Sequence, residues 1–150
     1  HVNWLGDGAR GIETFFLGPT EDPYLSHLAS RENRDSGYSL TALREILEGV
    51  YANLRQEESR RLAVAVQEAL FSHLGEVAPG IVDRGVKTAP FVVLVGTDMP
   101  AVLAEVSALS SEEEARLLEL PAYREYIALA IFSGIDTYAR SAHEPDYSAS

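Results

Sequence analysis

The sequence predicts an α/β domain in which helices cover both faces of a mixed sheet. Short apolar runs, bounded by glycine, proline or polar residues, occur at residues 11–17, 91–95 and 101–106 and favour strands. Longer stretches with apolar residues at helical spacing lie between and after these runs. Strands that alternate with helices are typical of a sheet covered by helices. Three strands are few for so much helix, so we expect further N-terminal strands of the sheet upstream of residue 1.

The first half of the chain is predicted to form one strand followed by helices. The strand at residues 11–17 ends at a glycine–proline pair, and a weakly helical stretch follows at 24–33. Ser39 or Thr41 can cap a further helix that continues to about residue 50. A longer helix is expected over residues 57–73, where apolar residues form one stripe.

The second half is predicted to contain the other two strands and two more helices. Residues 83–86 are interpreted as a turn that leads into a buried strand at 91–95, and a second buried strand follows at 101–106. A serine and glutamate capping signature then predicts a short acidic helix. Pro121 suits the first turn of a final helix, and residues 141–150 are expected to form a polar tail.

Composition excludes several classes of protein. A chain of 150 residues suits one domain. The net charge of −11 argues against nucleic-acid binding, because neutralising phosphates requires clustered lysine and arginine. The chain has no cysteine, so it has neither disulfides nor a thiolate metal site, and no apolar run approaches the roughly 18 residues of a membrane span. Because the sequence opens on His1 rather than methionine, we expect its true N-terminus upstream.

Glu105 is the most informative single residue, because a carboxylate within an apolar strand is costly to bury without a partner. Alternation along the strand places Glu105 on one face with Leu103 and Ser107. Two interpretations stay open at this point. Glu105 is either a strand-end residue that reaches solvent or pairs with an arginine, or a catalytic carboxylate.

The histidines do not form a complete metal site by local spacing. His1 precedes a glycine-rich loop, His27 and His73 lie on predicted helical faces, and His143 lies near the C-terminus. No paired-histidine motif occurs, so a structural or solvated role is the simpler interpretation for each of them.

Residues 84–87, which contain Arg84 and Lys87, have two possible roles. They could bind an anion, or they could form a charged turn before a buried strand, and the second interpretation is favoured. Gly85 is expected to adopt a backbone conformation that other residues resist.

Taken together, several segments resemble the zinc-dependent N-acetylmuramoyl-L-alanine amidases that remodel bacterial cell walls. The likeness runs from His1 to about Arg140, and its strength comes from many matches in the same order. The matching segments are residues 1–3, 9–17, 29–33, 83–87, 89–94, 97–106, 109–115 and 121–128.

The resemblance implies which residues act. In this family two histidines and one glutamate hold Zn²⁺, and His1 falls at the position of the last of these ligands. The other two belong to an upstream segment, so residues 1–140 correspond to the C-terminal two-thirds of a catalytic domain. Glu105 matches the family's catalytic carboxylate. Ser111 stands where an asparagine is common in the family. This difference affects the expected contacts to the substrate more than the expected reaction.

The resemblance also implies a function. The expected reaction is hydrolysis of the amide bond between N-acetylmuramic acid and L-alanine in peptidoglycan, by metal-activated water with Glu105 as general acid and base. The family further implies a periplasmic or extracellular monomer, with an activator protein as a possible partner.

An alternative from another class is a non-catalytic wall-binding or interaction module that keeps the fold without a complete metal site. The sequence before His1 distinguishes the two, because the enzyme requires a histidine and a glutamate ligand there. An unrelated α/β hydrolase is disfavoured by the lack of a Gly-x-Ser-x-Gly elbow.

Overall fold

The sheet of the protein is mixed, as the sequence predicts. The computed structural model describes residues 10–37, 54–95 and 97–143. Within them, three strands have the order β2-β1-β3. β1 pairs in parallel with β2 and antiparallel with β3. The strands are β1 at Ile12–Leu17, β2 at Asp83–Ala89 and β3 at Val102–Glu105.

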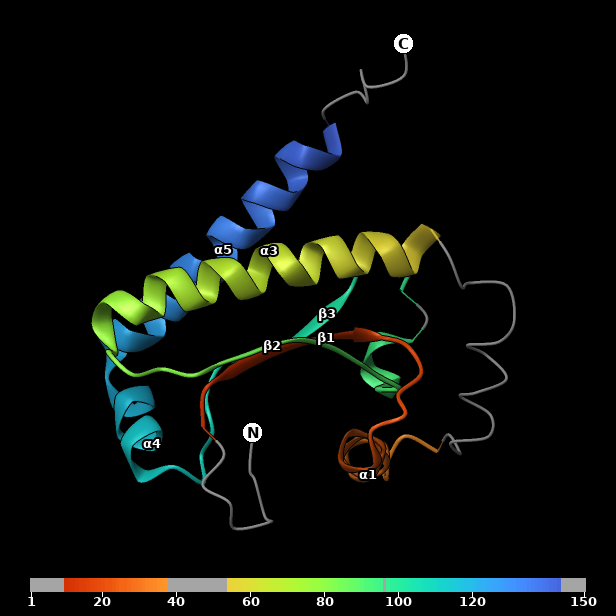
Figure 1. The fold of residues 1–150 in the computed structure, drawn as a ribbon, viewed down its shortest axis with the longest axis horizontal. Coiled ribbons are helices and arrows are strands. Elements are labelled where there is room, and N and C mark those ends of the chain that lie inside the picture. The colour runs from red at the N-terminus through yellow and green to blue at the C-terminus, as the bar shows by residue number, and fades with distance from the viewer. Residues whose placement is uncertain (1–9, 38–53, 96, 144–150) are drawn as a thin grey trace.

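Helices lie on both faces of this sheet, which confirms the predicted fold class. α3 (Leu54–Val77) and α5 (Pro121–His143) cover one face, and α1 (Pro23–Glu32) covers the other (Figure 1). The short α4 (Glu112–Glu119) follows β3 and leads into α5. None of the helices within the described residues is both long and apolar enough to cross a membrane.

Two apolar clusters fix these layers, one on each face of the sheet. The cluster under α3 and α5 consists of Ile12, Val66, Leu70, Leu74, Tyr123, Ile127 and Ala130. The cluster under α1 consists of Phe15, Leu25, Leu28, Ala29, Ala89, Phe91 and Leu94. Because successive side chains of a strand point to opposite faces, the central strand β1 supplies a residue to each cluster.

The helix starts follow the local signals in the sequence. The Asp22 side chain accepts a hydrogen bond from the Tyr24 amide at 2.8 Å and caps α1, whose first residue is proline. Ser111 caps α4, and α5 begins at Pro121, as predicted. α5 extends to His143, beyond the expected start of the tail at residue 141. The helix expected to start at Ser39 or Thr41 lies outside the described residues.

Two predicted elements are wrong. Residues 83–86 belong to strand β2 rather than to a turn, and the predicted strand at 91–95 contains a 3₁₀ helix at Val92–Leu94. Pro90 has no N–H to extend the ladder beyond Ala89.

The Asn33 side chain takes over the hydrogen bonds that a strand partner would make. Its Nδ2 donates to the Pro90 carbonyl and its Oδ1 accepts from the Val92 amide, both at 2.8 Å. Val93 is 70% exposed, so this apolar run is not buried throughout. The side chain of the residue that caps the C-terminus of α1 therefore takes the place of the predicted strand pairing.

Candidate active site

Glu105 is the last residue of β3 and is partly buried. In the register of β1 and β3 it lies directly opposite Glu13. Residues opposite each other in an antiparallel pair point to the same face of the sheet. Glu105 and Glu13 therefore share the face that α1 covers, where Leu103 also packs.

Glu13 is only 3% exposed and is held by two cations from β2. Its Oε2 accepts a hydrogen bond from Arg84 Nε at 3.2 Å and a second, short one from Lys87 Nζ. A carboxylate buried this deeply requires such partners, because desolvation otherwise costs several kcal/mol. We call Glu105, Glu13, Arg84 and Lys87 the charged row, since they cross all three strands on one face.

A bulge in β2 makes this row possible. The pairing of β1 with β2 shifts at Glu13, so that both Arg84 and Gly85 lie opposite that single residue. Gly85 has φ +76°, the left-handed conformation that glycine adopts without steric cost. Asp83 Oδ1 accepts hydrogen bonds from the Gly85 amide at 2.8 Å and from Gln67 Nε2 of α3 at 2.6 Å. The special backbone expected at Gly85 is confirmed.

The bulge changes the direction of one basic side chain. Arg84 and Lys87 are three positions apart, and in a regular strand residues three apart point to opposite faces. The extra residue removes this difference, and both cations contact Glu13. The charged row therefore depends on one additional residue in β2.

Tyr24 of α1 lies within electrostatic reach of the charged row. Its ring packs against the cluster under α1. Burial raises the pKa of the Tyr24 phenol, and the charges of Glu13, Asp22 and Glu105 raise it further, whereas Arg84 lowers it. The pKa of the Tyr24 phenol thus depends on both carboxylates of the row and on one of its cations.

The loop after Glu105 is anchored by Glu114, a buried residue in the first turn of α4. Its carboxylate accepts hydrogen bonds from the Gly11 amide at 2.6 Å, the Ala108 amide at 2.7 Å and the Ser107 hydroxyl at 3.1 Å. It thereby ties the end of β3 to the start of β1. The sequence shows Glu114 only as part of an acidic helix start.

The described residues do not by themselves fit a zinc ion. No group of three histidine, aspartate or glutamate side chains among them is placed to hold a metal. His73 Nδ1 lies 2.8 Å from the Ala69 carbonyl of its own helix. His1, the predicted ligand, lies outside the described residues.

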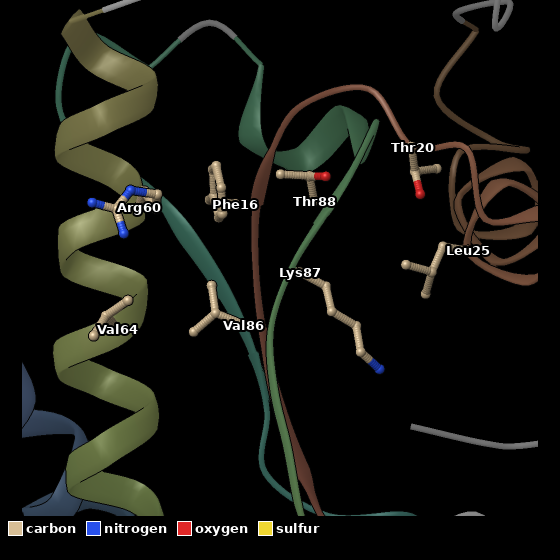
Figure 2. A pocket seen from close by; sticks show the side chains of 8 residues that line it. All are labelled: Phe16, Thr20, Leu25, Arg60, Val64, Val86, Lys87 and Thr88. Carbon is tan, nitrogen blue, oxygen red and sulfur yellow. The ribbon is translucent and has the colours of Figure 1, made fainter.

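A pocket of about 470 Å³ lies along the outer edge of β2 and does not include Glu105 (Figure 2). Val64 from α3 and Leu25 from α1 approach it from the two faces of the sheet. Its lining is completed by Phe16, Thr20, Arg60, Val86, Lys87 and Thr88. Lys87 belongs to both the pocket lining and the charged row, and its ammonium group pairs with Glu13.

Glu105 is a partly buried carboxylate at a strand end, beside paired charges. A carboxylate in such a setting is of the kind that transfers protons in hydrolases. The family described as N-acetylmuramoyl-L-alanine amidase matches residues 1–137. The chain belongs to this family.

Individual relatives agree with this assignment. N-acetylmuramoyl-L-alanine amidase AmiA of Escherichia coli (strain K12) is 30% identical over 115 residues, which cover 77% of this chain and 39% of AmiA. The solved structure of an N-acetylmuramoyl-L-alanine amidase from Clostridium difficile 630 shares the fold with a TM-score of 0.63 at 23% identity. The match covers 94% of this chain and 54% of that structure.

A second solved structure is the CwlD amidase from Clostridioides difficile in complex with the GerS lipoprotein. It has a TM-score of 0.59 at 21% identity, over 94% of this chain and 52% of that one. The chain thus spans about half of these solved structures and less of AmiA.

Proposed function

We propose that the protein containing this chain hydrolyses the amide bond between N-acetylmuramic acid and L-alanine in peptidoglycan. Family membership supports the reaction, and the position of Glu105 is the observation that carries the assignment of the site. Glu105 stands at a strand end, partly shielded from water and directly opposite the ion-paired Glu13. A titratable group fixed in this way suits general acid–base work.

In this proposal Glu105 accepts a proton from the attacking water and returns it to the leaving amine. Glu114 holds the following loop and limits the movement of Glu105.

The proposal includes a requirement for Zn²⁺, with His1 as one ligand and the others supplied by sequence upstream of residue 1. Its support is the family resemblance, and imidazole nitrogen is a preferred zinc donor. When bound, the metal would supply a water of lowered pKa and positive charge for the developing oxyanion.

The relatives support a proposal for the site of action and for a partner. Peptidoglycan lies outside the cytoplasmic membrane, so we propose a periplasmic or extracellular protein that acts as a monomer. The CwlD amidase is described in complex with a lipoprotein, and we propose that an activator protein also acts here.

The decisive test of Glu105 is Glu105→Gln in the full-length protein. Removing a general acid–base lowers turnover by about 10²–10⁴-fold. Release of stem peptides from purified peptidoglycan should therefore fall to background, with the thermal midpoint unchanged. Glu113→Gln is the matched control, since Glu113 is exposed and forms an ion pair with the exposed Arg10. More than a few per cent of activity in Glu105→Gln would overturn the assignment.

The requirement for zinc is tested by metal analysis of the full-length protein. The wild type should contain about one zinc per chain, and His1→Ala should lose most of it. A wild type that is free of metal and sediments with peptidoglycan without cleaving it would favour the non-catalytic wall-binding module instead.

A further inference from the structure

Arg84 combines three properties that a purely structural ion pair does not require. It comes from a bulge that turns its side chain onto the face of Glu105, and it is oriented by a deeply buried carboxylate. Its side chain nevertheless retains 26% exposure. A cation that one carboxylate orients and that stays partly exposed is suited to bind a second anion.

The hydrogen bonds of Arg84 leave its outer edge available. Nε donates to Glu13 Oε2, and within the part of the chain that the structure describes no hydrogen bond engages the two Nη atoms. These two atoms form the planar fork that matches both oxygens of a carboxylate. Lys87, in contrast, directs its single charge at Glu13.

The charges of the row balance, unlike those of the molecule as a whole. Arg84 and Lys87 contribute two positive charges, and Glu13 and Glu105 contribute two negative ones. The whole chain carries a net charge of −11, so an acidic ligand is repelled over most of the molecule. The balanced row lacks that net repulsion, and the guanidinium group of Arg84 offers the ligand a charge-assisted contact there.

The spacing suits the stem peptide of peptidoglycan. Strands β3 and β2 flank β1, so the backbones at Glu105 and Arg84 are roughly 10 Å apart, twice the usual strand spacing. The second residue of the stem peptide carries a carboxyl group that is either free or amidated. In an extended peptide this group lies roughly 6 Å from the scissile nitrogen. The side chains of Glu105 and Arg84 can span the rest.

We propose that Arg84 binds the carboxylate on the second residue of the stem peptide and thereby selects the free-acid form of the substrate over the amidated form. This inference rests on the proposed function, since it places the scissile amide at Glu105. Glu13 is the positioning residue for Arg84, and Gly85 supplies the bulge that directs it.

The test compares two muropeptides of equal length in the full-length protein. They differ only at the second residue, which carries either a free carboxylate or a carboxamide. The wild type should show a KM roughly tenfold lower for the acid, since a charge-assisted hydrogen bond contributes about 1.5 kcal/mol or more. Arg84→Gln should abolish this preference while kcat on the amidated muropeptide changes less than twofold.

A conservative variant distinguishes the loss of the preference from a loss of folding. Arg84→Lys keeps the charge and a bond to Glu13 but lacks the fork, so it should fold and lose most of the preference. Arg116→Gln is the matched control for loss of one positive charge, because Arg116 is exposed on α4 and pairs with Glu112. This control should retain the full preference for the acid.

The two proposals fail in distinguishable ways. If the wild type cleaves both muropeptides but Arg84→Gln and Arg84→Lys keep the preference for the acid, the role of Arg84 is wrong and the proposed function stands. If the wild type cleaves neither muropeptide, the proposed function is overturned. Calorimetric titration of metal-free protein with the released acid and amidated peptides then tests Arg84 directly, and equal affinities would overturn its role.

Discussion

At the scale of single residues, Glu114 shows how a side chain outside the chemistry can control a site. Its two oxygens serve two backbone amides and one hydroxyl that would otherwise be buried without an acceptor. Burial also raises the pKa of Tyr123, and the charge of Glu114 adds to that rise. Glu114 is therefore a structural residue that fixes the loop after Glu105.

We predict that Glu114→Ala destabilises the protein by about 3 kcal/mol or more, because each buried donor left without an acceptor costs about 1–3 kcal/mol. Urea denaturation would measure the change. Glu113→Ala is the neighbouring control and should fall within about 0.5 kcal/mol of wild type, since Glu113 is exposed. Equal stability of the two variants would contradict the role assigned to Glu114.

A second residue-scale prediction concerns pH. A hydrogen bond from Arg60 lowers the pKa of Glu57 to about 2. A depressed folded-state pKa adds stability that is present above the ordinary value of 4.5 and is lost as the pH falls through about 2. Glu57→Gln should therefore flatten the dependence of the thermal midpoint on pH between these values. Glu125→Gln, at an exposed position of α5, should leave that dependence as in wild type.

At the scale of elements, α3 and α5 approach each other closely at Gly134. A Cβ atom added there would lie 2.6 Å from the Val66 Cα and 2.8 Å from the Ala65 carbonyl oxygen. These are backbone atoms of the facing helix, which cannot rotate away. The glycine therefore sets the distance between the two helices that cover this face of the sheet.

We predict opposite effects for two glycine-to-alanine substitutions in these helices. Gly134→Ala should destabilise by about 1–3 kcal/mol, because α3 and α5 have to separate. Gly75→Ala, where an added Cβ meets nothing within 4 Å, should stabilise by about 1 kcal/mol through helix propensity. Thermal unfolding of both variants measures this. A stabilising Gly134→Ala would contradict the close approach.

The elements also show what the sequence could and could not predict. The start of α5 at Pro121 and the cap of α4 at Ser111 depend on neighbouring residues, so local patterns predict them. The 3₁₀ helix at Val92–Leu94 depends on Asn33, which lies 59 positions before the Val92 amide that it binds. The pairing of Arg84 with Glu13 joins residues 71 positions apart. No local pattern reveals either contact.

At the scale of the whole molecule, the acidic balance has a measurable consequence. With a net charge of −11 on 150 residues, the negative side chains of the folded protein repel one another, and salt screens that repulsion. We predict that the thermal midpoint rises when NaCl is increased from about 20 mM to about 300 mM, since the Debye length then falls below roughly 10 Å. A midpoint that falls with salt would show that attractive ion pairs outweigh the net repulsion.

The order of the strands also affects when the sheet can form during synthesis. Among the described strands, β1 comes first in the chain but lies between the other two, so both of its strand partners are synthesised after it. During that interval Ile12, Phe15 and Phe16, all buried in the folded protein, lack the cover that depends on this pairing. Pairings this distant in sequence are slow to form, because loop closure costs entropy before any contact is gained. Translation that pauses before residue 83 would therefore prolong the lifetime of an aggregation-prone intermediate, and chaperones that bind extended apolar segments would act first on β1.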